Sequence, residues 1–207
     1  MKRSRWVVVT ALVTSAVSAS GIAFAVVGHG DTASAAGTVT QVVSIAQTAL
    51  PASARDVHGK RSGELLSVDL QGDGSALVML YDYASGLTHQ ITVDSGRVSD
   101  EESAPRMRPP ASGDETAAAF GIALRAPHPL PFTATFAEQQ GVPLVSADQV
   151  KVDAEPWTPE RGDTPSACTV DRCMQLRVAT AAGEYLDTSD FVVDLSAGRV
   201  RRVKSAS

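Results

Sequence analysis

Apolar and polar residues alternate along two long stretches of the chain. This alternation predicts β-strands, because successive side chains of a strand point to opposite faces of a sheet. Glycine-containing turns separate the predicted strands, so both stretches are expected to form antiparallel meanders. The predicted strands cover residues 65–70, 76–83 and 87–93 in the first stretch, and 149–155, 174–179, 191–195 and 199–203 in the second.

A predicted helix precedes each meander. Residues 40–50 carry apolar side chains close to the i, i+3, i+4, i+7 spacing and end before a proline. A second helix is predicted over 117–124, with Ser112 or Asp114 as its N-cap and Pro127 beyond its end. The order helix, sheet, helix, sheet predicts an α+β fold of two successive helix-plus-antiparallel-sheet units.

Composition divides the chain further. Residues 1–36 form a separate N-terminal segment, and residues 101–112 combine acidic residues with prolines, a composition typical of a linker. We therefore predict that the first helix-plus-sheet unit covers residues 37–100 and that the second covers residues 113–207.

The N-terminal segment has the layout of an export signal. A basic head at residues 2–5 precedes a largely apolar stretch over 6–30 without acidic or basic residues, and Ala33-Ser34-Ala35 follows as a small-x-small site. This layout predicts a signal peptide cleaved after Ala35. The alternative is an uncleaved membrane anchor, because the apolar stretch is long enough to span a bilayer. Both alternatives predict an extracytoplasmic protein, either secreted or anchored to the cell membrane.

The amino-acid composition argues against several classes of function. Of the 207 residues 43% are hydrophobic but only 5% are aromatic, and the formal net charge is -5. Few aromatic residues argue against a platform that stacks bases or sugars, and the acidic balance argues against nucleic acid as a partner. No cofactor is expected. The chain also lacks the common catalytic motifs of hydrolases, metalloproteases and nucleotide-binding proteins, so we predict that it is not an enzyme.

The two cysteines, Cys168 and Cys173, carry the most specific chemistry in the sequence. In an oxidising compartment an isolated pair this close usually forms a disulfide bond. The alternative is a Cu(I) site formed by Cys168, Cys173 and Met174, because thiolate and thioether ligands select this ion. The sequence leaves both chemistries open.

Arginines are concentrated at the C-terminus. Arg199, Arg201 and Arg202 lie in the last predicted strand together with valines. Basic residues commonly protect the edge strand of a sheet against aggregation. The functional interpretation is that these arginines bind a partner, either an acidic protein or an anionic polymer of the cell envelope.

The two halves share a sequence repeat. Residues 87–98 read LTHQITVDSGRV and residues 190–200 read DFVVDLSAGRV, each with Val-Asp, a glycine turn and Arg-Val. The order helix, strands and closing hairpin, present twice, resembles the tandem cystatin-like or PepSY-like modules of secreted actinobacterial proteins, and is similar to the non-catalytic N-terminal domains of copper amine oxidases. The resemblance implies a secreted protein with no catalytic activity of its own.

These observations lead to one functional hypothesis and one alternative. The first is a secreted or membrane-tethered, non-enzymatic binding module of the cell envelope, with an envelope or secreted protein as its partner. The resemblance implies that this partner is an exported enzyme or peptidase whose activity the module modulates. Contact with the membrane is expected only through an uncleaved N-terminal segment. The alternative is an extracytoplasmic Cu(I)-handling protein.

Overall fold

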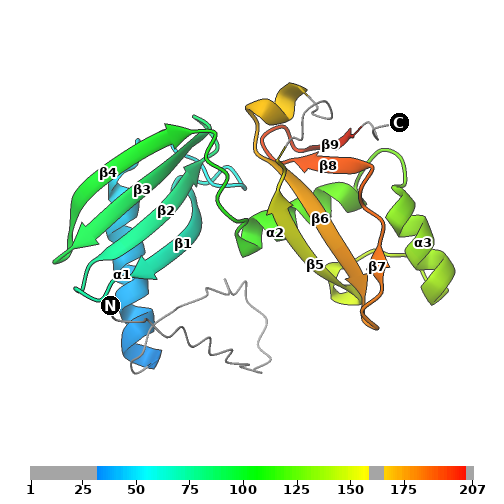
Figure 1. The fold of residues 1–207 in the computed structure, drawn as a ribbon, viewed down its shortest axis with the longest axis horizontal. Helices are drawn as coiled ribbons and strands as arrows, with labels where there is room; N and C mark the ends of the chain where they lie inside the picture. The colour runs from blue at the N-terminus through cyan, green and yellow to red at the C-terminus, as the bar shows by residue number, and fades with distance from the viewer. Residues whose placement is uncertain (1–31, 159–165, 204–207) are drawn as a thin grey trace, which may run out of the picture.

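The computed structural model describes residues 32–158 and 166–203, and side chains of the first helix from residue 38 onward. Within these residues the chain has an α+β fold with three α-helices and two antiparallel sheets (Figure 1). The fold class is therefore confirmed at this level. Most of the predicted export signal lies outside the described residues, and the predicted cleavage point after Ala35 falls within the first helix.

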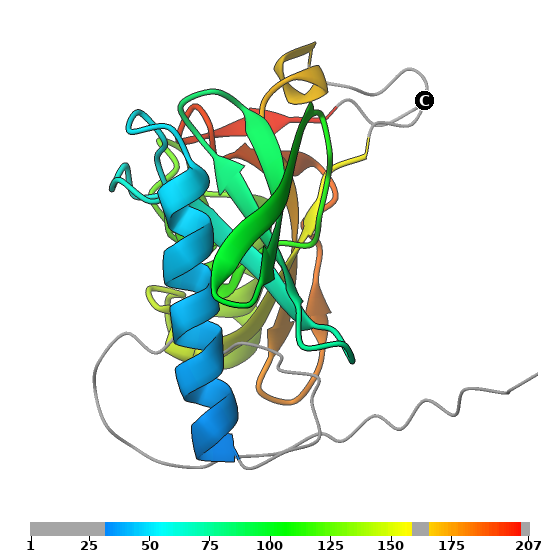
Figure 2. The same cartoon turned by 90° about the vertical axis from the view of Figure 1, so that its left-hand side faces the viewer.

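The first sheet has the strand order β1-β2-β3-β4. Helix α1 lies along one face of this sheet, as Figure 2 shows. Ala46 of α1 packs in a core with Val78, Leu80, Ile91 and Val93, which the alternation of strands β2 and β3 directs to this face. The elements are α1 (Thr32–Ala49), β1 (Glu64–Leu70), β2 (Ala76–Asp82), β3 (Leu87–Asp94) and β4 (Arg97–Pro105).

The second sheet has the strand order β5-β6-β8-β9, with the short strand β7 paired to β6. Helices α2 and α3 contribute Phe120 and Phe132 to a core in which the Phe132 ring stacks on that of Phe191 in β8. The elements are α2 (Gly113–Leu124), α3 (Pro131–Gln140), β5 (Val150–Pro156), β6 (Cys173–Thr180), β7 (Tyr185–Leu186), β8 (Phe191–Asp194) and β9 (Arg199–Arg202), with short 3₁₀ helices η1 (Ala147–Gln149) and η2 (Ser166–Thr169).

The structure corrects the predicted linker. Strand β4 continues to Pro105, so the acidic residues 100–102 lie on an edge strand and not in a connection between sheets. Their side chains are exposed, and an edge strand that is solvated on both faces shows no apolar alternation that could have predicted it. The connection between the two halves is residues 106–112.

Candidate functional site at the junction of the two sheets

The N-terminus of α2 forms a capping box. The backbone N–H of Glu115 donates to Ser112 Oγ at 2.9 Å, and the backbone N–H of Ser112 donates to Glu115 Oε2 at 3.1 Å. The sequence Ser112-Gly113-Asp114-Glu115 has the spacing that this motif requires. Of the two predicted caps, Ser112 is therefore the one used, and the box directs the Glu115 carboxylate into the interior.

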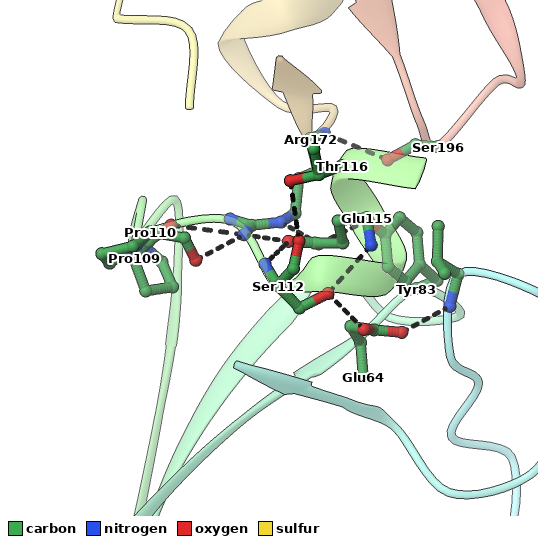
Figure 3. A network of polar contacts seen from close by, with 10 residues as sticks. Glu64, Tyr83, Pro109, Pro110, Ser112, Glu115, Thr116, Arg172 and Ser196 are labelled. Carbon is green, nitrogen blue, oxygen red and sulfur yellow. Dashed lines mark hydrogen bonds and ion pairs between the residues drawn. The ribbon is translucent and has the colours of Figure 1, made fainter. Parts of the chain in front are cut away.

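Glu115 is a fully buried carboxylate with two donors from distant parts of the chain (Figure 3). The Arg172 guanidinium binds both carboxylate oxygens: Nε donates to Oε1, and Nη2 donates to Oε2 at 2.7 Å. Tyr83 directly follows β2 of the first sheet, and its hydroxyl donates to Oε1 at 2.6 Å. A buried charge is tolerated only when it is paired and hydrogen-bonded, and Glu115 meets both conditions.

Arg172 directly precedes β6 and is itself buried. Its Nη2 also donates to the carbonyls of Pro109 and Pro110, at 3.2 and 3.3 Å, so it binds the connection between the two halves. The guanidinium carbon lies 5.0 Å from the centre of the Tyr81 ring, within the range of a cation–π contact. Arg172 thus contacts the connecting segment, the first sheet and helix α2.

Glu64, the first residue of β1, is the second buried carboxylate of the junction. Ser112 Oγ donates to Glu64 Oε1 at 2.5 Å, and the backbone N–H of Val57 donates to Oε2 at 3.2 Å. The cap of α2 therefore binds a strand of the other sheet. We call Glu64, Tyr83, Ser112, Glu115 and Arg172 the junction network.

Burial and pairing change the ionisation of this network. Burial raises the pKa of Glu64 above its ordinary value, and the neighbouring Glu115 charge adds to the effect. Burial and the same Glu115 charge raise the pKa of the Tyr83 phenol, so this group stays a hydrogen-bond donor. Burial alone would lower the pKa of Arg172, but its bond to Glu115 raises it above the ordinary value. Arg172 consequently keeps its positive charge beside the Glu115 carboxylate.

The junction leaves little space for a substrate. The cavity beside the network, lined by Tyr81, Arg106, Arg108 and Asp171 among others, has room of about 20 Å³, which is roughly one water molecule. The ionisable side chains of the network are already engaged: Glu115 binds Arg172 and Tyr83, and Glu64 binds Ser112. This arrangement suits a structural connection between the two sheets and gives a reacting molecule no access to a free carboxylate.

Cys168 and Cys173 form a disulfide bond, which confirms the prediction. The bond is buried and packs against Val192. It closes the loop that carries Arg172, and Arg108 Nη2 donates to the Cys168 carbonyl at 2.9 Å. The disulfide therefore holds in place the loop that supplies the cation of the junction network. Such a bond is typical of an oxidising, extracytoplasmic compartment.

The geometry does not bring the three sulfur atoms of the Cu(I) hypothesis together. The Cys173 side chain packs in the cluster that surrounds the disulfide, whereas the fully buried Met174 packs in the core with Phe191. Adjacent residues of a strand point to opposite faces, so Met174 lies on the other side of β6 from Cys173. In residues 32–158 and 166–203, no group of three or more His, Cys, Asp or Glu side chains is placed to hold a metal ion.

The three arginines of the C-terminal strand have different environments. Arg201 is largely covered and donates to the buried Asp194 from Nε at 2.6 Å and from Nη2 at 2.5 Å. The Arg202 side chain is 74% exposed, and its Nη1 lies 3.6 Å from Asp190 Oδ2. Arg199 is exposed. Arg201 therefore stabilises the β8–β9 hairpin, while Arg199 and Arg202 present their charge to solvent.

Sequence reasoning missed most of the junction network. The capping spacing at residues 112–115 was the one local signal, and it indicated a helix start without indicating a buried ion pair. Arg172 and Tyr83 lie 57 and 32 positions away from Glu115, so their contact depends on tertiary structure. The fact that Arg172 lies between two cysteines gave no indication of its partner.

No protein-family model and no curated protein matches this chain. Among the helices of the described residues, none combines the length and the apolar character needed to cross a membrane.

Proposed function

We propose that the chain is a secreted or membrane-tethered, non-enzymatic binding module of the cell envelope, composed of two helix-plus-sheet units. Its partner is an envelope or secreted protein, and an exported enzyme or peptidase is the class that the cystatin-like resemblance favours. The module binds this partner through the outer edge of β9, with which no strand pairs among the residues that the structure describes. Function resides in particular residues and not in the fold, and the residues of this edge support the binding role.

The observation that carries the proposal is the exposure of charge on an outermost strand. β9 ends the second sheet, and Arg199 and Arg202 extend from it into solvent. The backbone groups on the outer side of such a strand are suited to pair with an extended segment of another protein, while the arginines select an acidic one. Arg201, fixed by Asp194, keeps the strand in place for this contact.

The junction network supports the same interpretation. It commits the buried Glu64, Glu115 and Arg172 to holding the two units together, so these groups are not available to a partner and the exposed edges are the surfaces that can bind one. A binding module gains from this arrangement because a fixed edge loses less conformational entropy when a partner pairs with it.

The experiment is site-specific photocrosslinking in cells that produce the full chain. A photoreactive amino acid replaces Arg202 on β9, and a matched variant carries it in place of Lys151, an exposed residue of β5 at the opposite edge of the same sheet. We expect a discrete crosslinked envelope or secreted protein from position 202 and none from position 151. The crosslinked protein is then purified, and its affinity for the chain is measured.

Charge reversal completes the test. The variant Arg199→Glu/Arg202→Glu should bind the purified partner at least about tenfold more weakly, because reversed charges repel an acidic segment, and the loss should diminish at high salt. Lys151→Glu should leave the affinity unchanged within about twofold. Identical crosslinks from both positions, or an affinity that is insensitive to the β9 reversal, would show that β9 is not the binding edge.

A further inference from the structure

Two strands lie at the outside of their sheets and carry opposite charges. β4 is the last strand of the first sheet and β9 is the last strand of the second. β4 exposes Asp100, Glu101 and Glu102, whereas β9 carries Arg199, Arg201 and Arg202. In the part of the chain that the structure describes, no further strand pairs with the outer side of either one. Each outer side is therefore an open edge on which another strand can form a ladder.

Strand alternation distributes the charges of these two edges over both faces of their sheets. Asp100 and Glu102 pair with alternate residues of β3, so both side chains lie on one face of the first sheet. Arg199 and Arg201 pair with alternate residues of β8 and likewise share a face. Side chains two residues apart on one face of a strand are separated by roughly 7 Å. Arg201 is bound to Asp194, so the exposed guanidinium on this face is that of Arg199. Arg202 lies on the other face of β9, as Glu101 does on β4. A β4 strand beside a β9 strand can therefore place carboxylates opposite an exposed guanidinium on each face.

The same charges disfavour pairing between identical edges. Two β4 strands would bring three acidic residues against three acidic residues, and two β9 strands would do the same with arginines; like charges directly opposite one another are destabilising. Within one molecule β4 and β9 belong to different sheets and do not pair with each other (Figure 1). The combination that remains is β4 of one molecule with β9 of another.

We propose that copies of this chain associate head to tail by pairing the acidic edge strand β4 of one copy with the arginine-rich edge strand β9 of the next. The two surfaces differ, so each added copy leaves one β4 edge and one β9 edge free. Such a heterologous contact gives an open chain of molecules and not a closed two-fold dimer. The association is expected to depend on concentration and to weaken in salt, because exposed ion pairs are screened. It requires no other protein. It uses the same outer edge of β9 as the proposed envelope partner, so a β9 strand makes one of these contacts at a time, and the test below uses the purified chain alone.

The test is sedimentation velocity of the purified full chain in a mild detergent that keeps the N-terminal segment dispersed. At low ionic strength the weight-average sedimentation coefficient should rise across about a hundredfold increase in protein concentration, as mass action requires. At about 0.5 M salt, where the Debye length falls to a few ångströms, the rise should be much smaller.

Two charge-reversed variants test the contact itself. Asp100→Lys/Glu102→Lys makes both edges basic, and Arg199→Glu/Arg202→Glu makes both edges acidic. Each variant alone should sediment as a single molecule at every concentration, and an equimolar mixture of the two should associate again because their edges are complementary. The control is Glu155→Lys on β5, which reverses an exposed charge on a different edge and should associate like the unmodified chain. Circular dichroism checks that every variant is folded.

The outcomes are decisive in either direction. Loss of association in each reversed variant and its recovery in the mixture would establish the β4–β9 contact. The proposal is overturned if the unmodified chain sediments as a single molecule over the whole concentration range at low salt. It is also overturned if association persists in either reversed variant, or if the mixture fails to restore it.

Discussion

The buried carboxylate of Glu115 depends on one guanidinium for its charge. The Arg172 side chain is only 3% exposed and that of Glu115 is fully buried, so neither charge is solvated by water. Removal of one partner from a buried pair leaves the other uncompensated, which costs about 3–5 kcal/mol in comparable cases. Exposed pairs contribute about 0–1 kcal/mol. The same two residue types therefore have very different energetic importance at different places in this fold.

Substitution of Arg172 by Met tests this difference. We expect the free energy of unfolding to fall by about 3–5 kcal/mol, because the Glu115 charge would remain buried without a cation. The matched control is Arg177→Met, which breaks the Arg177–Glu155 pair, whose side chains are 55% and 50% exposed. Its expected cost is below about 1 kcal/mol. Urea unfolding at neutral pH measures both. Equal losses in the two variants would contradict a buried ion pair at the junction.

Glu64 gives the junction a dependence on pH. Burial raises its pKa above the ordinary value of 4.5, so the folded chain binds this proton more tightly than the unfolded chain does. Stability from this group is therefore greatest below pH 4.5 and decreases as the pH rises through the folded-state pKa. We expect the unfolding free energy of the unmodified chain, relative to Glu64→Gln, to decrease between pH 4 and pH 7. A difference that is constant or increases with pH would contradict a raised pKa.

At the scale of elements, strands that pack one face against a helix, such as β2 and β3, were predictable from the sequence. Strand β4, which is exposed on both faces, was not. The alternation in β2 and β3 follows directly from a sheet with one face on a helix, and both strands lie within two residues of their predicted ends. β4 has almost every side chain in water, so its sequence carries no such signal. Helix α3 was missed because its core contribution is limited to Phe132 and Phe136 within ten residues.

Helix α1 begins earlier than the sequence predicted. Its first turns, residues 32–37, consist of Thr, Ala, Ser and Gly, which are also the residue types of a peptidase cleavage site. The prediction therefore placed the start of the helix at residue 40 and read the preceding residues as the end of an export signal. Small residues are compatible with both structures, and periodicity starts to distinguish them only where apolar residues such as Val39 and Val42 begin.

At the scale of the whole molecule, the junction network joins the two halves into one structure. Glu64 and Tyr83 come from the first half, whereas Ser112, Glu115 and Arg172 come from the second. No local pattern predicts this joining, because each contact links residues that are distant in sequence. The network could be predicted only in so far as Ser112 and Glu115 have the spacing of a capping box.

Hydrogen exchange can measure the coupling between the halves. Tyr83→Phe removes one donor to Glu115 and should lower stability by about 1 kcal/mol. If the halves unfold together, the slowest amides of β2 and β3 and those of β6 and β8 should lose protection to the same extent, by roughly fivefold. Tyr185→Phe, in which the replaced residue is 78% exposed, is the control and should change neither sheet. Loss of protection in one sheet alone would show that the halves unfold separately.

The position of Arg172 in the chain also sets an order of events during synthesis. A ribosome completes Glu64, Tyr83 and Glu115 well before it adds residue 172, so the growing chain has the Glu115 carboxylate but not its cation. Docking of the first sheet on α2 at that stage would bury a charge without a partner, which is unfavourable. The first sheet and α1 can form while the chain grows, but the junction closes only when the last third of the protein has been made.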